Sequence, residues 1–139
     1  MKKSGLLNPA LCAAIARLGH TDGLVICDAG LPIPVGPERI DLSVIPGLPP
    51  FVDVLSAILD EVQVERAVLA SEYTQASPAH HAKTMTLLNR ASAAQGSGLE
   101  MDAVTHEAFK RLVADCKAVI RTGECTPYAN IILYSGVPF

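Results

Sequence analysis

The residues best suited to acid–base chemistry lie within one short stretch, on either side of an apolar run. His20 follows the helix-ending residue Gly19 in a predicted turn, and Asp28 ends the apolar strand that comes next. Small α/β domains commonly place functional side chains at the ends of core elements. An imidazole exchanges protons near neutral pH, and a carboxylate can orient it or bind a substrate hydroxyl. The sequence therefore predicts an acid–base histidine paired with a carboxylate. A charge at a helix end and a cap of the following turn are the alternative roles for these two residues.

A second group of polar residues lies later in the chain. His106 follows Thr105 at a predicted helix start, where its side chain either faces a cleft or is solvated. The segment 123–130 lies between two predicted strands and contains Tyr128, which can stack on a sugar face, hydrogen-bond through its hydroxyl, or simply fill the core. Asn130 can both donate and accept hydrogen bonds, as the recognition of hydroxyl groups requires.

The remaining histidines and the cysteines carry weaker signals. His80 and His81 are neighbours on a predicted helix and face different directions, so we interpret them as surface residues. The four cysteines lack C-x-x-C spacing and lie mostly in apolar runs, which favours buried, reduced thiols. The sequence shows no cluster of zinc ligands and no phosphate loop, nucleophile elbow or dinucleotide motif. The polar residues that remain suit proton transfer on a polyol, with no metal and no cofactor.

The order of the predicted elements indicates an α/β fold. Hydrophobic patterning predicts helices over 9–18, 50–61, 77–94 and from 105 onward, and strands over 24–27, 64–70, 99–104, 118–121 and 130–134. Helices that alternate with short apolar strands are typical of a sandwich in which helices flank a mainly parallel sheet. Three prolines in 32–37 fix φ and predict a rigid loop suited to lining a site. We expect residues 1–139 to form a single domain.

The composition narrows the class of protein. Half of the residues are hydrophobic, 18% are charged, and the net charge is −3. This apolar surplus predicts subunit interfaces, and the lack of a basic surface argues against a nucleic acid partner. Met1-Lys2-Lys3 followed by Leu6, Leu7 and Cys12 imitates an export signal, but Asn8-Pro9 interrupts the apolar stretch and predicts a helix start instead. We therefore expect a cytoplasmic protein with no membrane partner.

Four stretches of the sequence are similar to the ribose pyranase and fucose mutarotase family. They are 18–22, 27–34, 105–107 and 120–133, and the resemblance covers essentially the whole chain. Thr21 and the Ala-Gly-Leu-Pro sequence after Asp28 resemble the ribose branch of the family. The resemblance implies a cytoplasmic α/β enzyme that interconverts the pyranose and furanose forms of ribose without a cofactor. It also implies rings of five subunits, often stacked as a decamer, with each site in a cleft between neighbouring subunits.

The resemblance also implies roles for individual residues. His20 takes the position of the family's proton donor, whereas the sugar-binding positions fall on Asp28, His106, Tyr128 and Asn130, with Ala129 contributing through the same loop. The segment 71–98 departs most from the family's pattern, and we expect it to affect surface and interfaces more than chemistry.

Ring interconversion suits these residue types. Opening the hemiacetal adds a proton to the ring oxygen and removes one from the anomeric hydroxyl, so one or two acid–base groups are enough. Other hypotheses stay open: a mutarotase of fucose or another sugar, a non-catalytic sugar-binding accessory to ribose uptake, and a structural ring protein. A Schiff base on Lys83, Lys110 or Lys117 is a different mechanism that reversible ring opening does not require.

Overall fold

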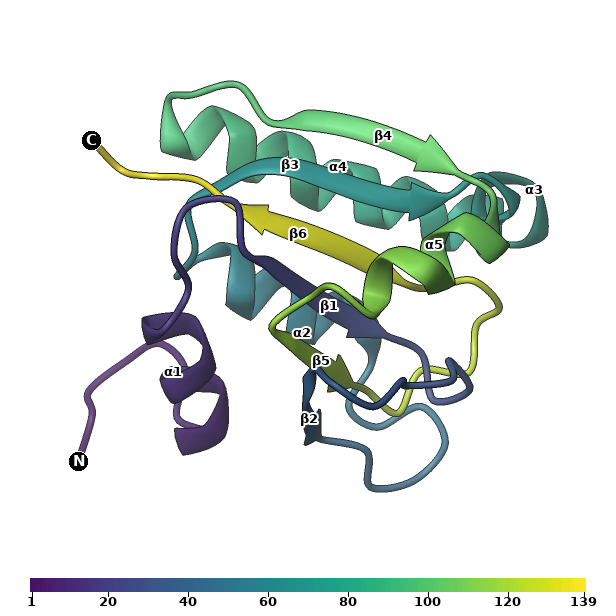
Figure 1. Cartoon of the computed structure of the whole chain (residues 1–139), viewed down its shortest axis with the longest axis horizontal. Coiled ribbons are helices and arrows are strands. Elements are labelled where there is room, and N and C mark those ends of the chain that lie inside the picture. Colours follow the sequence, from purple (N-terminus) through teal and green to yellow (C-terminus); the bar gives the residue numbers. More distant parts are fainter.

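The computed structural model describes residues 1–139 and contains one six-stranded sheet (Figure 1). In sheet order the strands are β2 (Glu38–Asp41), β5 (Ala118–Arg121), β1 (Gly23–Cys27), β6 (Ile131–Ser135), β3 (Val64–Ala70) and β4 (Glu100–Val104). The pairs β2–β5, β5–β1 and β3–β4 are parallel, whereas β6 is antiparallel to both β1 and β3. The predicted α/β fold with a mainly parallel sheet is confirmed. The direction of β6 was not predictable, because a continuously apolar strand is buried whichever way it runs.

Helices cover both faces of the sheet. The helices α1 (Pro9–Ala16), α2 (Phe51–Leu59), α3 (Glu72–Ala76) and α4 (Pro78–Gln95) pack on one face, and α5 (His106–Val113) packs on the other (Figure 1). The larger core joins Ile26 of β1 to Leu55 of α2 and Leu88 of α4, and the smaller core joins Val25 of β1 to Phe109 of α5. Successive residues of β1 thus enter opposite cores, as expected for a strand between two layers. None of the helices is both long and apolar enough to span a membrane.

Two helix starts follow from their capping residues. Asn8 Oδ1 accepts a hydrogen bond from the Leu11 amide at 3.1 Å, and Thr105 Oγ1 accepts one from the Ala108 amide at 3.2 Å. These side chains satisfy amides that the first helical turn leaves without partners. Both predicted starts are confirmed, and the second makes His106 the first residue of α5.

Two elements lie where the sequence predicted none. The strand β2 is an edge strand in which only Ile40 is buried, and α3 is a helix of 5 residues between β3 and α4. Short elements with little buried surface leave a weak hydrophobic period in the sequence. In addition, α1 and α2 end at Ala16 and Leu59, before the predicted ends at 18 and 61.

The cysteines are all free thiols. Cys27 and Cys116 are buried, Cys12 is partly buried and Cys125 is exposed. Burial raises the pKa of Cys27 and that of Cys116 to about 12, so neither thiol ionises near neutral pH. These two buried residues therefore behave as small core side chains.

Candidate active site

Asp28 and Asn130 form the centre of a polar cluster at the carboxyl end of β1. Asp28 directly follows β1 and Asn130 directly precedes the antiparallel β6, so the sheet itself brings them together. The Asp28 amide donates to Asn130 Oδ1 at 2.9 Å, and Asn130 Nδ2 donates to Asp28 Oδ2 at 2.9 Å. Because Asn130 is 1% exposed, this pair of bonds is what makes burial of its amide group favourable. Asp28 Oδ1 also accepts the Gly30 amide at 2.9 Å, so the carboxylate caps its turn as well.

His106 and Tyr128 reach the same cluster from two other segments. Their rings meet edge to face, with centroids 5.0 Å apart and an interplanar angle of 83°. The His106 amide donates to both Glu72 carboxylate oxygens, at 2.9 and 3.1 Å. Nδ1 of His106 is buried without a hydrogen-bond partner, which favours the tautomer with its proton on Nε2, because a buried N–H without an acceptor is costly. Tyr128 has a φ of +62°, a left-handed conformation that a non-glycine residue keeps only where its surroundings impose it.

A hollow of about 270 Å³ lies between these segments. It is lined by Asp28, Gly30, Leu31, Pro32, His106, Pro127, Tyr128 and Asn130. The structure thus brings together polar side chains that lie far apart in the sequence, around a space suited to a small ligand. Ala129 does not line the hollow: it is fully buried, and its amide donates to the Thr126 carbonyl at 3.3 Å.

His20 lies at the other end of β1. Its Nε2 is 2.7 Å from Glu65 Oε2, and its side chain is 54% exposed. Since a strand rises by about 3.3 Å per residue, β1 alone separates the two ends by roughly 17 Å. Within one chain, therefore, the prediction that Asp28 orients the His20 imidazole is wrong. The carboxylate partner of His20 is Glu65, which the sequence did not single out.

A larger hollow lies elsewhere and has a different character. Its volume is about 480 Å³, and it is bordered by α1, α2, α4 and the C-terminal segment, including Leu18, Leu59 and Leu87. No histidine or tyrosine lines it. No three His, Cys, Asp or Glu side chains gather in the chain as a metal site would require. We therefore assign the candidate site to the smaller hollow.

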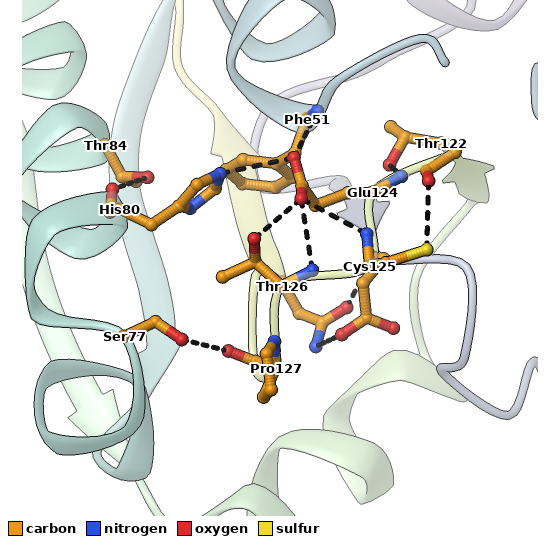
Figure 2. Close-up of polar contacts among 12 residues, drawn as sticks. Phe51, Ser77, His80, Thr84, Thr122, Glu124, Cys125, Thr126 and Pro127 are labelled. Atoms are coloured by element: carbon orange, nitrogen blue, oxygen red, sulfur yellow. Dashed lines mark hydrogen bonds and ion pairs between the residues drawn. The ribbon is translucent and has the colours of Figure 1, made fainter. Parts of the chain in front are cut away.

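The segment 71–98 contributes more to this site than its sequence suggested. Ser77 Oγ donates to the Pro127 carbonyl at 3.2 Å, and His80 Nε2 lies 3.2 Å from Glu124 Oε2 (Figure 2). The His80 side chain is only 16% exposed, so its interpretation as a surface residue is wrong. Within the segment only Tyr73, Thr84 and Leu88 are buried, and the expectation that it affects surface and interfaces more than chemistry stays a prediction. No local signal separated His80 from His81, because both lie in the first turn of the helix.

The chain is similar over its whole length to a protein family, to individual sequences and to a solved structure. The sequence profile of the RbsD / FucU transport protein family matches residues 1–138. A D-ribose pyranase from Photobacterium profundum is 51% identical and one from Haemophilus influenzae is 49% identical, each over 139 residues and 100% of both chains. The solved structure of Bacillus subtilis RbsD complexed with D-ribose is 45% identical, covers 100% of both chains and superposes with a TM-score of 0.91. The chain belongs to the RbsD / FucU transport protein family.

Proposed function

We propose that the protein is a sugar isomerase that interconverts the pyranose and furanose forms of D-ribose. The observation that carries the proposal is the convergence of Asp28, His106, Tyr128 and Asn130 on one small hollow. Relatives of about half identity are named D-ribose pyranase, and the similar RbsD structure contains D-ribose. Carboxylate, imidazole and amide groups beside an aromatic ring suit both the hydroxyl groups and the apolar face of a sugar.

Each lining residue has a separate task in the proposed complex. The Asp28 carboxylate, held by Asn130 and the Gly30 amide, keeps lone pairs that can accept sugar hydroxyl protons. Nε2 of His106 donates to a sugar oxygen, and Tyr128 contributes its ring face or its hydroxyl. Asn130 positions Asp28 and offers its second N–H, whereas Ala129 acts only through the loop.

We further propose that His20 of a second copy of the chain completes each site as the proton donor. His20 is more than half exposed, so a neighbouring copy can bring the imidazole to the hollow that its own chain does not reach. Exposed apolar side chains such as Val35, Val44 and Ile45 favour burial against another copy. The assembly that we propose is the one implied by the family resemblance, rings of five stacked as a decamer, in the cytoplasm.

The proposed reaction is proton transfer without loss or gain of atoms. His20 protonates the ring oxygen as the hemiacetal opens, and solvent water takes the proton that the anomeric hydroxyl loses. On closure the attacking hydroxyl returns its proton to the imidazole, and water returns a proton to the former carbonyl oxygen. General acid–base catalysis of this kind contributes about 10²- to 10⁴-fold, and holding the open chain in a ring-closing conformation contributes more.

Saturation-transfer NMR of D-ribose tests the proposal directly. The wild-type protein should accelerate exchange between ring forms over buffer, and His20→Ala should lose about 10²- to 10⁴-fold of that rate while still binding ribose. Binding without acceleration by the wild type would instead indicate a sugar-binding protein. Faster exchange of fucose than of ribose would indicate a different mutarotase, and no ribose binding would favour a structural role.

A further inference from the structure

We propose that Glu124 and His80 are positioning residues that hold the loop carrying Tyr128 and Asn130 in the geometry that binds the sugar. This inference rests on the proposed function. Neither side chain lines the hollow, so both act through the loop rather than on the substrate.

The Glu124 carboxylate organises the loop from inside. Oε1 accepts the amides of Cys125 and Thr126, both at 3.1 Å, and the Thr126 hydroxyl at 2.7 Å (Figure 2). The side chain is 12% exposed. Burial acts to raise the pKa of Glu124, but the hydrogen bonds from Thr126 and Phe51 outweigh it and the pKa is lowered. The carboxylate therefore stays ionised, and its hydrogen bonds are charge-assisted.

The other oxygen of Glu124 ties the loop to a helix. The residue before α2 is Pro50, which offers no side-chain acceptor to the helix start. Oε2 of Glu124 accepts the Phe51 amide at 3.2 Å in its place. A carboxylate at a helix N-terminus is also favoured by the helix dipole. The loop is thereby fixed relative to α2, which belongs to the larger core.

His80 holds the same oxygen from the opposite side. Its Nε2 donates to Glu124 Oε2 at 3.2 Å, while its Nδ1 lies 2.5 Å from the Tyr73 hydroxyl. That hydroxyl lies 2.9 Å from Thr84 Oγ1, and both residues are fully buried. Burial raises the pKa of Tyr73 to about 12, so it remains a donor at neutral pH. Tyr73 therefore donates to His80, and His80 donates to Glu124, while the Thr84 hydroxyl also lies 3.3 Å from the His80 carbonyl to which it donates.

Both walls of the hollow depend on Glu124. Its carbonyl accepts the Ala29 amide at 2.8 Å, which anchors the turn that follows Asp28. Its carboxylate anchors Thr126, which comes two residues before Tyr128 and its left-handed backbone. A displacement of Glu124 therefore moves the two sides of the site relative to each other. Misplacement by about 1 Å is enough to reduce catalysis strongly.

Two substitutions of His80 separate this role from a purely structural one. In His80→Gln the side-chain amide can reach the place of Nε2 and donate to Glu124, but the contact with Tyr73 is lost. In His80→Asn the shorter amide can replace Nδ1 toward Tyr73, but Glu124 loses its donor. Glu124→Gln replaces one of the two carboxylate oxygens by an NH₂ group. That group faces backbone N–H donors and cannot accept their hydrogen bonds. His81→Gln, at the neighbouring histidine, and Glu100→Gln, at an exposed strand position, are the matched controls.

We expect His80→Asn and Glu124→Gln to raise the KM for ribose, measured by NMR exchange, about tenfold or more, as the loss of a hydrogen bond to a charged group would. His80→Gln should stay within about threefold of the wild type, and the two controls should not differ from it. In the sugar-free protein, the Thr126 amide should exchange its hydrogen faster in His80→Asn and Glu124→Gln only.

Several outcomes would overturn the proposal. One is a wild-type KM in both His80→Asn and Glu124→Gln. Another is a larger increase in KM for His80→Gln than for His80→Asn. That result would mean that His80 acts through its contact with Tyr73 and the packing of its helix, and not through Glu124. A wild-type protein that does not accelerate ribose exchange would contradict the proposed function instead. The Thr126 exchange rates would then still decide whether His80 and Glu124 hold the loop.

Discussion

The polar side chains at the two ends of β1 differ in burial and in hydrogen bonding. At the carboxyl end, Asp28 and Asn130 are joined by two hydrogen bonds of 2.9 Å and flanked by His106 and Tyr128. At the amino end, His20 has one carboxylate neighbour, Glu65, and about half of each side chain is exposed. A single chain thus gathers the four polar residues of the hollow and leaves the proposed proton donor on its surface. Under the proposed function, sugar binding is organised mainly by one chain, and the acid–base group comes from another copy.

The energetic consequences of the two environments also differ. Removing the hydrogen-bond partner of a buried polar group such as Asn130 costs about 1–3 kcal/mol of stability, because the group that remains is shielded from water. An exposed ion pair such as His20–Glu65 contributes about 0–1 kcal/mol. The carboxyl end is therefore expected to be rigid and sensitive to substitution, and the amino end tolerant.

Mixing two inactive variants gives the largest expected effect and tests whether the two ends cooperate between chains. His20→Ala and Asp28→Asn should each lose most of the accelerated ribose exchange. When equal amounts are unfolded and reassembled together, about a quarter of sites between copies should contain both native residues, since each copy contributes independently. The recovered exchange rate is measured by saturation-transfer NMR.

A mixture of wild type with the double variant is the control for this experiment. Sites between copies predict that about a quarter of the wild-type rate remains there too. Sites within one chain predict about half in the control and no recovery when the single variants are mixed. That second pattern would contradict the placement of His20 in the site of a neighbour.

Glycine substitutions should show how tightly the carboxyl end is packed. A Cβ on Gly123 would lie 2.2 Å from the Leu48 carbonyl oxygen, whereas a Cβ on Gly98 would meet nothing within 4 Å. Gly123→Ala should therefore lower the free energy of unfolding by about 3 kcal/mol, because backbone rather than a flexible side chain must move. Gly98→Ala should change it by less than about 1 kcal/mol. Urea denaturation measures both, and equal losses would contradict the tight approach of the two loops.

Much of the carboxyl end was accessible to sequence reasoning for a local reason. Asp28 and Asn130 each stand at the boundary of an apolar run, where a polar residue signals the end of a strand. The strand 64–70 and the helix start at His106 were found in the same way, from runs and caps that a few residues determine. Such signals depend only on residues that are close in the sequence, so they can be recognised before the tertiary structure is known.

What could not be predicted depends on contacts between distant segments. His80 is partly buried under a loop 44 residues away, and its partner Glu124 lies in that loop. Two adjacent histidines on a helix do not show which one faces the protein until the neighbouring loop is placed. The separation of His20 from Asp28, by contrast, was predictable, because the strand predicted over 24–27 already stood between them.

Acid should weaken the carboxyl end through Glu124. Since its pKa is lowered on folding from the ordinary 4.5, the ionised carboxylate stabilises the protein above that value, and this contribution is lost as the pH falls through the folded-state pKa. At pH 7 Glu124→Gln should be less stable than the wild type by about 1–2 kcal/mol. The difference should shrink on acidification, as measured by urea denaturation between about pH 7 and pH 3. A difference that is constant over this range would contradict the role of the ionised carboxylate.

Removal of the ion pair at the amino end should have the smallest effect. Because His20 and Glu65 are 54% and 42% exposed, Glu65→Gln should change the free energy of unfolding of the separate chain by less than about 1 kcal/mol. If a second copy covers His20, the His20–Glu65 ion pair is shielded from water in the assembly. Removing one of its charges there lowers the free energy of unfolding by more than in the separate chain. The destabilisation, measured by thermal unfolding, should therefore grow with protein concentration as copies associate, whereas that of Glu124→Gln, which depends on contacts within one chain, should not. A destabilisation by Glu65→Gln that is the same at all protein concentrations would indicate that His20 stays exposed in the assembly. That result would contradict its placement between copies.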